Sequence, residues 1–254
     1  MFNVSLTSTY QNQSRLYQTL NDLITNQTVL PDNIFLQLSE HPYLKDTGFS
    51  NKIITDKNLL NLLEDNKDLI VVNWVDNIGP YRKLIYTIED FWESEIPIIT
   101  IDDDHTYNEN LFKNLIHDFE IYNMSCNYRG FTLNLNDINS FNYENRIKPT
   151  QKISIYNFST NGGGAIFSSK FFKKTNKLLL DKNIFLNLCN TADDIWYNLI
   201  RMANQENLYL DSKPWLRKDN SNHRDGLYFN YNKKNNDDLG KKVIKYLIEN
   251  NHTL

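Results

Sequence analysis

Apolar residues in the first half of the chain fall into short runs that alternate with stretches of helical spacing. The run at 69–72 has the length of a buried strand, whereas Leu16, Leu20 and Leu23 recur along one face of a helix. On this pattern we expect strands at 2–7, 34–38, 69–72 and 97–101, and helices at 13–23, 58–63, 81–92 and 108–119. Strands that alternate with helices favour an α/β fold, in which helices flank a mostly parallel central sheet.

The second half of the chain is less regular. Its pattern predicts strands at 129–135, 151–158 and 162–168, helices at 194–204 and 241–249, and an irregular polar segment at 211–236. No internal repeat and no linker rich in Pro, Gly or Ser divides the sequence. We therefore expect a single domain over 1–254, made of a first half at 1–125, a second half at 126–236 and a C-terminal helix within 237–254.

Composition and charge narrow the class of protein. Hydrophobic residues make up 40% and aromatic residues 13% of the chain, which is enough for a core. The net charge of −4 leaves no general basic footprint, so we expect no nucleic acid partner. There is no basic and apolar leader at the N-terminus and no apolar run of bilayer length. We therefore expect no membrane span and a cytoplasmic protein.

The two cysteines, Cys126 and Cys189, say little about function. They form no CxxC pair, which argues against a structural zinc site. A reducing compartment is the simplest interpretation, and a disulfide between them remains an open alternative.

Three consecutive aspartates, Asp102, Asp103 and Asp104, directly follow the apolar run 96–101. Like charges this close repel, and a cation would resolve the conflict. Carboxylate oxygens suit Mg²⁺ or Mn²⁺, and alternation along a strand lets Asp102 and Asp104 share a face. The alternative is a polar strand exit with solvated acids. Because ligands in open α/β sheets bind at the carboxyl ends of the strands, we favour the first interpretation.

Two glycine-containing segments offer further chemistry. At 79–83 a Gly-Pro turn opens a helix with Arg82 and Lys83 in its first turn, which favours anions or is an ordinary strand-to-helix connection. At 161–164 three glycines let the backbone approach a ligand closely, or form a hairpin. No Lys followed by Ser or Thr comes at the spacing of a P-loop.

Acids and histidines of the second half add two more candidates. At 191–194 Thr191 can cap a helix whose first turn holds Asp193 and Asp194, or one of the acids can face the crevice as a general base. His223 and Arg224 lie in a polar stretch that is either a solvated loop or a loop folded back over a metal and a phosphate. No partner can be named from the sequence for the other histidines, His41, His105, His117 and His252.

Taken in order, these segments resemble the GT-A type glycosyltransferases, which transfer a sugar from a nucleotide diphosphate. The resemblance runs from Val4 to about Tyr197 and rests on 7–8 with Arg15, 76–83, 99–107, 162–164 and 192–196. It implies a GT-A-like sandwich, with 1–125 as the nucleotide-binding half and 126–236 as the acceptor side. The loop at 9–14 lacks a proline that the family often has there, which affects the match at Arg15. The abundance of Asn also resembles that of a large DNA virus.

The resemblance also implies a role for each matching residue. The aspartate triplet would be a DxD-type motif. Asp194, with Asp193 as the second choice, would be the base of an inverting mechanism. The metal ligands would be Asp104, Asp102 and His223. The donor would contact Thr7, Ser8, Arg15, Asp76, Lys83, Asp102, Asp103, Gly163 and Gly164.

The activity that follows is transfer of a sugar from a nucleotide-sugar donor, with UDP the expected nucleotide, to a hydroxyl of a glycan or other acceptor. Mn²⁺ or Mg²⁺ would be required, and the host cytoplasm would be the location if the source is viral. A sugar nucleotidyltransferase is one alternative, although 7–14 is not the Gly-rich basic loop it usually has. A non-catalytic carbohydrate-binding or cation-binding module is the other.

Overall fold

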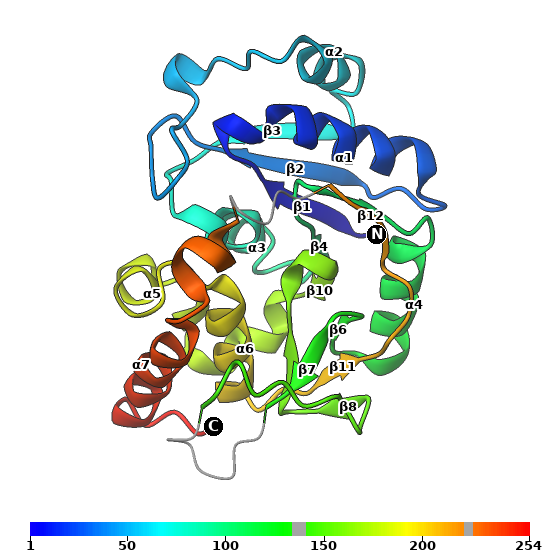
Figure 1. Ribbon diagram of the computed structural model, residues 1–254. Coiled ribbons are helices and arrows are strands. Elements are labelled where there is room, and N and C mark those ends of the chain that lie inside the picture. The colour runs from blue at the N-terminus through cyan, green and yellow to red at the C-terminus, as the bar shows by residue number, and fades with distance from the viewer. Residues whose placement is uncertain (134–140, 221–225) are drawn as a thin grey trace.

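The computed structural model describes residues 1–133, 141–220 and 226–254 (Figure 1). A sheet of eight strands runs through its centre. In spatial order these strands are β3 (Ile70–Trp74), β2 (Asn33–Leu38), β1 (Asn3–Thr7), β4 (Ile98–Thr100), β10 (Ala165–Phe167), β6 (Ser125–Asn127), β11 (Leu208–Leu210) and β8 (Ile153–Ser154).

Two of these strands, β10 and β8, run antiparallel to their neighbours. The strands from β3 to β4 are parallel, as are β6 and β11. β10 is inserted antiparallel between β4 and β6, and β8 is antiparallel to β11 at the edge. β10 therefore joins the two halves of the chain in one sheet.

Helices cover both faces of the sheet (Figure 1). The α-helices are α1 (Gln13–Asn26), α2 (Lys57–Asp65), α3 (Ile85–Asp90), α4 (Leu111–Tyr122), α5 (Lys182–Leu188), α6 (Asp193–Ala203) and α7 (Asn236–Glu249). Successive side chains along β1 point to opposite faces of the sheet. On one face, Phe2 packs edge-on against Phe112 of α4. On the other face, the hydroxyl of Ser5 lies 2.6 Å from that of Thr87 in α3. The predicted α/β architecture, with a mostly parallel sheet flanked by helices, is confirmed.

Two small ribbons lie beside the central sheet. β5 (His105–Tyr107) pairs with β12 (Leu216–Asp219), and β7 (Gly130–Thr132) pairs with β9 (Asn157–Ser159). The segment 211–236, which the sequence predicted as irregular, thus contains a strand, and it also contains a π-helical turn at Tyr228–Asn232.

Other local differences from the sequence pattern have identifiable causes. The helix expected at 81–92 starts as a 3₁₀ turn, η3 (Gly79–Lys83), and α3 follows it, because Gly79 has a φ of 64° and Pro80 opens the turn. The single strand expected at 151–158 is two short strands, β8 and β9, in different sheets. The sequence pattern did not predict β6, β11 or α5. β6 and β11 have only three residues each, which is too short to show a period.

Two further findings bear on the expectations from composition. Cys126 and Cys189 are both free and buried. Within the described ranges, no helix combines the length and the apolar character needed to cross a membrane.

Candidate functional site

A cavity of about 890 Å³ opens where β1 and β4 end. Both halves of the chain contribute to its wall, as expected for the carboxyl edge of an α/β sheet. Of the residues that the sequence singled out, the following line it: Thr7, Ser8, Arg15, Lys83, Asp102, Asp103, Asp104, Asp193 and Asp194.

Lys83 holds two acids of the cavity together. Its Nζ lies 3.0 Å from Oδ1 of Asp102 and 3.1 Å from Oδ2 of Asp193. Only 7% of Lys83 is exposed, and burial alone would lower its pKa. The charges of Asp102 and Asp193 outweigh burial and raise that pKa above its ordinary value, so Lys83 stays cationic. It thereby joins the first half of the chain to α6.

Arg82, the neighbour of Lys83, supports the same region from behind. Its guanidinium pairs with Asp46 at 2.9 Å and donates to the backbone carbonyl of Ser8 at 3.3 Å. Burial lowers the pKa of Arg82, against the effect of Asp46. Arg82 is 2% exposed, so its role is to fix the loop after β1 against η3.

Two contacts fix the position of Asp102. The hydroxyl of Tyr107 accepts from the Asp102 backbone N–H at 2.8 Å and lies 3.1 Å from the carbonyl oxygen of Gly162. A Cβ atom at Gly162 would come within 2.5 Å of Asp102 Oδ2, so only glycine allows this approach. Burial would raise the pKa of Asp102, but Lys83 holds it below its usual value, so the residue is a carboxylate.

Asp104 and His105 form a second pair of interacting side chains in the cavity, next to Asp102. Oδ1 of Asp104 lies 2.6 Å from Nδ1 of His105, whose Nε2 is 3.8 Å from Oδ1 of Asp219. Burial would lower the pKa of His105, but the hydrogen bond to Asp104 raises it. Asp102, Asp104 and His105 each offer a ligand atom, and these atoms all lie within 4.8 Å of one another. Two carboxylates and an imidazole form a donor set that fits a divalent ion such as Mn²⁺.

Asp103 is distinct from its two neighbours. It accepts a short hydrogen bond from the hydroxyl of Ser8 at the end of β1. Burial and the charge of Asp104 raise its pKa to about 7. Asp103 therefore links the acidic triplet to β1.

Asp194 lies in the first turn of α6 and also lines the cavity. Its Oδ1 accepts from the backbone N–H of Asn161 at 3.0 Å. Burial and the nearby charge of Asp193 raise its pKa to about 7. Burial also raises the pKa of Asp193, although Lys83 opposes the shift. A carboxyl group with a pKa near neutrality suits proton transfer at physiological pH.

Four predicted site residues are not brought to the described wall of the cavity. The side chain of Asp76 is exposed, whereas its backbone carbonyl accepts hydrogen bonds from the hydroxyl of Tyr86 and the N–H of Ile78, both at 3.1 Å. Gly163 backs onto Arg129 and Gly164 onto Leu111, whereas Gly162 touches Asp102. His223 lies outside the described residues.

The wall also contains residues that the sequence gave no reason to select. His105 is one, and its position directly after the triplet was the available signal. Further examples are Arg129, Tyr143, Arg146 and Tyr228, which lie on segments without a periodic pattern.

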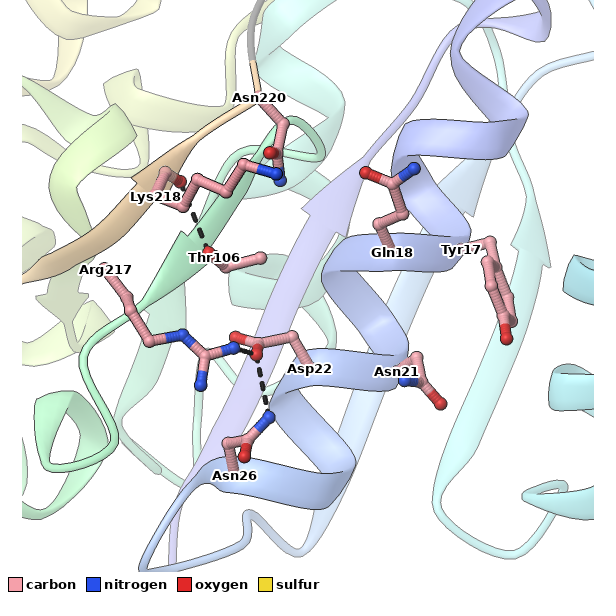
Figure 2. A pocket seen from close by; sticks show the side chains of 9 residues that line it. All are labelled: Tyr17, Gln18, Asn21, Asp22, Asn26, Thr106, Arg217, Lys218 and Asn220. Carbon is pink, nitrogen blue, oxygen red and sulfur yellow. Dashed lines mark hydrogen bonds and ion pairs between the residues drawn. The ribbon is translucent and has the colours of Figure 1, made fainter.

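A second hollow, a groove of about 620 Å³, lies between α1 and the β5–β12 ribbon (Figure 2). Figure 2 shows Arg217 and Asp22 facing each other across it, with Thr106 and Lys218 on the ribbon. Asp22 is buried, pairs with Arg217, and accepts from the amide of Asn26 at 2.8 Å. The lining of this groove is polar, and its buried acid has a cation.

No protein-family model matches the chain, and no curated protein matches its sequence. Solved structures match in fold. S. aureus TarS 1–349 gives a TM-score of 0.50 at 14% identity, over 85% of this chain and 59% of that one. The same TarS fragment in complex with UDP-GlcNAc gives 0.51 at 13% identity, over 89% and 61%.

A second kind of enzyme matches as well. The 4-diphosphocytidyl-2C-methyl-D-erythritol synthase of Anaerococcus prevotii gives a TM-score of 0.50 at 14% identity, over 83% of this chain and 86% of that one. The chain spans about three fifths of the TarS fragment. At these identities the likeness shows the fold alone, which is the GT-A-like fold expected from the sequence.

Proposed function

We propose that the protein is a metal-dependent glycosyltransferase that moves a sugar from a nucleotide-diphosphate donor, with UDP as the nucleotide, to an acceptor hydroxyl. One observation carries the proposal. A cluster of potential metal ligands and a separate carboxyl group of raised pKa line the same cavity, at the sheet edge where this fold binds ligands. The binding of UDP-GlcNAc by TarS, which has the same fold, supports the choice of donor.

In this proposal the donor lies against the part of the cavity wall that the first half of the chain forms. Thr7, Ser8 and Arg15 lie at the nucleotide end, and the guanidinium of Arg15 donates at 3.0 Å to the side chain of Asn12. Lys83 is neutralised by two carboxylates, so its role is to orient Asp102 and Asp193. Arg129 is exposed on the wall and replaces Lys83 as the cation nearest the diphosphate.

Asp102, Asp104 and His105 would hold the metal ion. A bound divalent ion supplies charge stabilisation for the nucleoside diphosphate as it leaves. Tyr107 and Gly162 keep Asp102 in place for that role. His105 takes the position that the resemblance had assigned to His223.

Asp194 takes the proton of the acceptor hydroxyl in this proposal. A hydroxyl is a poor nucleophile at neutral pH, and a nearby carboxylate accepts its proton as it attacks the sugar. Asp193 is engaged by Lys83 at 3.1 Å, which leaves Asp194 as the better base. Attack from the face opposite the leaving diphosphate inverts the anomeric centre.

A sugar nucleotidyltransferase is the second candidate, because a synthase of the diphosphocytidyl class has the same fold. Two activity assays separate the two candidates. The protein is incubated with nucleotide sugars, Mn²⁺ and simple sugar acceptors, and released nucleoside diphosphate is measured. The proposal expects metal-dependent release that increases with acceptor. Release of pyrophosphate from a nucleoside triphosphate and a sugar phosphate, without transfer, would establish the nucleotidyltransferase instead. Binding without turnover would indicate a carbohydrate-binding module.

A further inference from the structure

The side chain of Arg146 lies on the second-half wall of the cavity, on a platform of aromatic rings. The centre of its guanidinium is 5.0 Å from the ring of Tyr143, 5.5 Å from that of Phe131 and 5.8 Å from that of Tyr228. Phe131 and Tyr143 are themselves buried and packed edge to face at 5.3 Å. Stacking on several rings fixes the plane of an arginine while leaving its N–H groups available.

The guanidinium of Arg146 has no hydrogen bond or ion pair to any residue in 1–133, 141–220 or 226–254. The nearest acid in sequence, Glu144, accepts instead from the hydroxyl of Tyr228 at 3.1 Å. Arg146 is exposed to the cavity. In contrast, Arg82 and Lys83 of η3 are buried and paired with carboxylates. Among the described residues, the N–H donors of Arg146 thus have no partner, although three rings surround its guanidinium.

Arg146 lies on the side of the cavity that holds the proposed base. Burial and the charge of Asp194 raise the pKa of Tyr143, and the charge of Arg146 opposes that shift, so both charges lie close to this ring. The backbone N–H of Tyr143 donates to the side chain of Asp237 at 2.6 Å, which anchors the segment to the C-terminal helix α7. The nucleotide end, with Thr7 and Ser8, belongs to the first half.

We propose that Arg146, on its platform of Phe131, Tyr143 and Tyr228, binds an anionic group of the acceptor. The proposal rests on the proposed glycosyl transfer and names its acceptor class, which is a hydroxyl compound carrying a carboxylate or a phosphate. A planar guanidinium fork matches two oxygens of either group. The cation also offsets the repulsion that Asp193 and Asp194 exert on an anion approaching the base.

The test measures binding to the intact protein in the presence of UDP and Mn²⁺, by titration calorimetry. Glucuronic acid and glucose 6-phosphate are the carboxylate and phosphate probes, and glucose is the neutral one. Wild type should bind at least one anionic probe more tightly than glucose. Arg146→Gln should weaken the binding of that probe by about 10- to 100-fold and leave the affinity for glucose unchanged. Arg146→Lys keeps the charge without the fork and should be intermediate. Lys148→Gln, at an exposed position that does not line the cavity, should behave like wild type.

Each other outcome counts against the inference. Equal binding of charged and neutral probes, or no binding of either anionic probe, removes the subsite. An equal loss of UDP affinity in Arg146→Gln assigns Arg146 to the donor. If Arg146→Gln does not fold, the wild-type preference and Arg146→Lys still decide. An Arg146-dependent preference for an anion, in a protein that transfers sugar from no nucleotide sugar, would refute the proposed function and leave the subsite standing.

Discussion

The β5–β12 ribbon separates two polar hollows that handle charge in different ways. His105 and Asp219 face the large cavity, whereas their neighbours Thr106 and Lys218 face the groove drawn in Figure 2. This alternation is the ordinary consequence of strand geometry. In the groove, the one buried acid, Asp22, is paired with Arg217.

In the cavity, several buried acids lie close together and affect one another. Asp102 and Asp193 share a single lysine, and the pKa values of Asp103 and Asp194 are raised to about 7. A structure that only needed to be stable would pair these acids or expose them. The comparison shows that a polar lining alone does not indicate a functional site. Buried acids that share a cation or have raised pKa values do indicate one.

The largest expected effect comes from removing the proposed base. Asp194→Asn should lower kcat by about 10²- to 10⁴-fold, because general-base catalysis contributes that much, and should leave the donor Kd unchanged. Steady-state kinetics and donor titration measure both quantities. Asp22→Asn, the matched change of a buried acid in the groove, should keep kcat. Full turnover by Asp194→Asn would remove the residue as base.

A smaller loss is expected when the support of Asp102 is removed. Tyr107→Phe leaves the Asp102 backbone N–H without its partner and should weaken Mn²⁺ binding by about tenfold, as loss of a group behind a metal ligand does. Titration of Mn²⁺ followed by electron paramagnetic resonance provides the measurement. Tyr17→Phe, on a tyrosine of the groove, is the control and should leave Mn²⁺ affinity intact. Equal affinities in both variants would show that the hydroxyl does not position Asp102.

The pH dependence should reveal the raised pKa of Asp194. A base must be deprotonated, so kcat/KM should rise with pH and level off above about 7, with a slope of about tenfold per unit below it. A pH profile of the wild type tests this. Asp194→Asn should flatten the acidic limb in whatever activity remains. A profile that levels off near pH 4 would assign the proton transfer to a group of ordinary pKa.

The smallest expected effect is on thermal stability. Replacing a buried acid should raise Tm in the cavity and lower Tm in the groove. The folded-state pKa of Asp194 lies above the value of 3.8 for a free carboxyl, so its contribution favours the fold at low pH and is lost as pH rises through about 7. At pH 8, Asp194→Asn should therefore raise Tm by about 2 °C or more. Asp22→Asn, which breaks a pair, should lower Tm by about 4 °C. Thermal unfolding at two pH values measures both, and a fall in Tm for both variants would erase the contrast.

The sequence predicted the parts of this molecule that carry long-period or clustered signals. The strands of the first half are five or six residues long in three cases, and their alternation or apolar runs predict them well. The aspartate triplet at a strand end pointed to the cavity because parallel strands share a carboxyl edge. The start of α6 could be predicted because acidic residues favour a helix N-terminus.

The remainder depends on contacts between segments far apart in the chain. Nothing local distinguishes Gly162, which touches Asp102, from Gly163, which does not line the cavity. Lys83 looked like a free cation for phosphate, and only the arrival of Asp193 from α6 shows that it is neutralised. Arg146 became a candidate only once three rings from separate segments were seen to surround it. Short-range patterns do not encode such encounters.

The shared lysine has a consequence for how the protein matures. Lys83 meets Asp102 within the first half, but it meets Asp193 only after α6 has docked against that half. Contacts between such distant segments form late, because closing the long intervening loop costs entropy. A nascent or truncated chain that ends before α6 therefore has the acidic triplet without its counterpart. In the proposed glycosyltransferase, such a chain would lack the base, so we expect it to transfer no sugar.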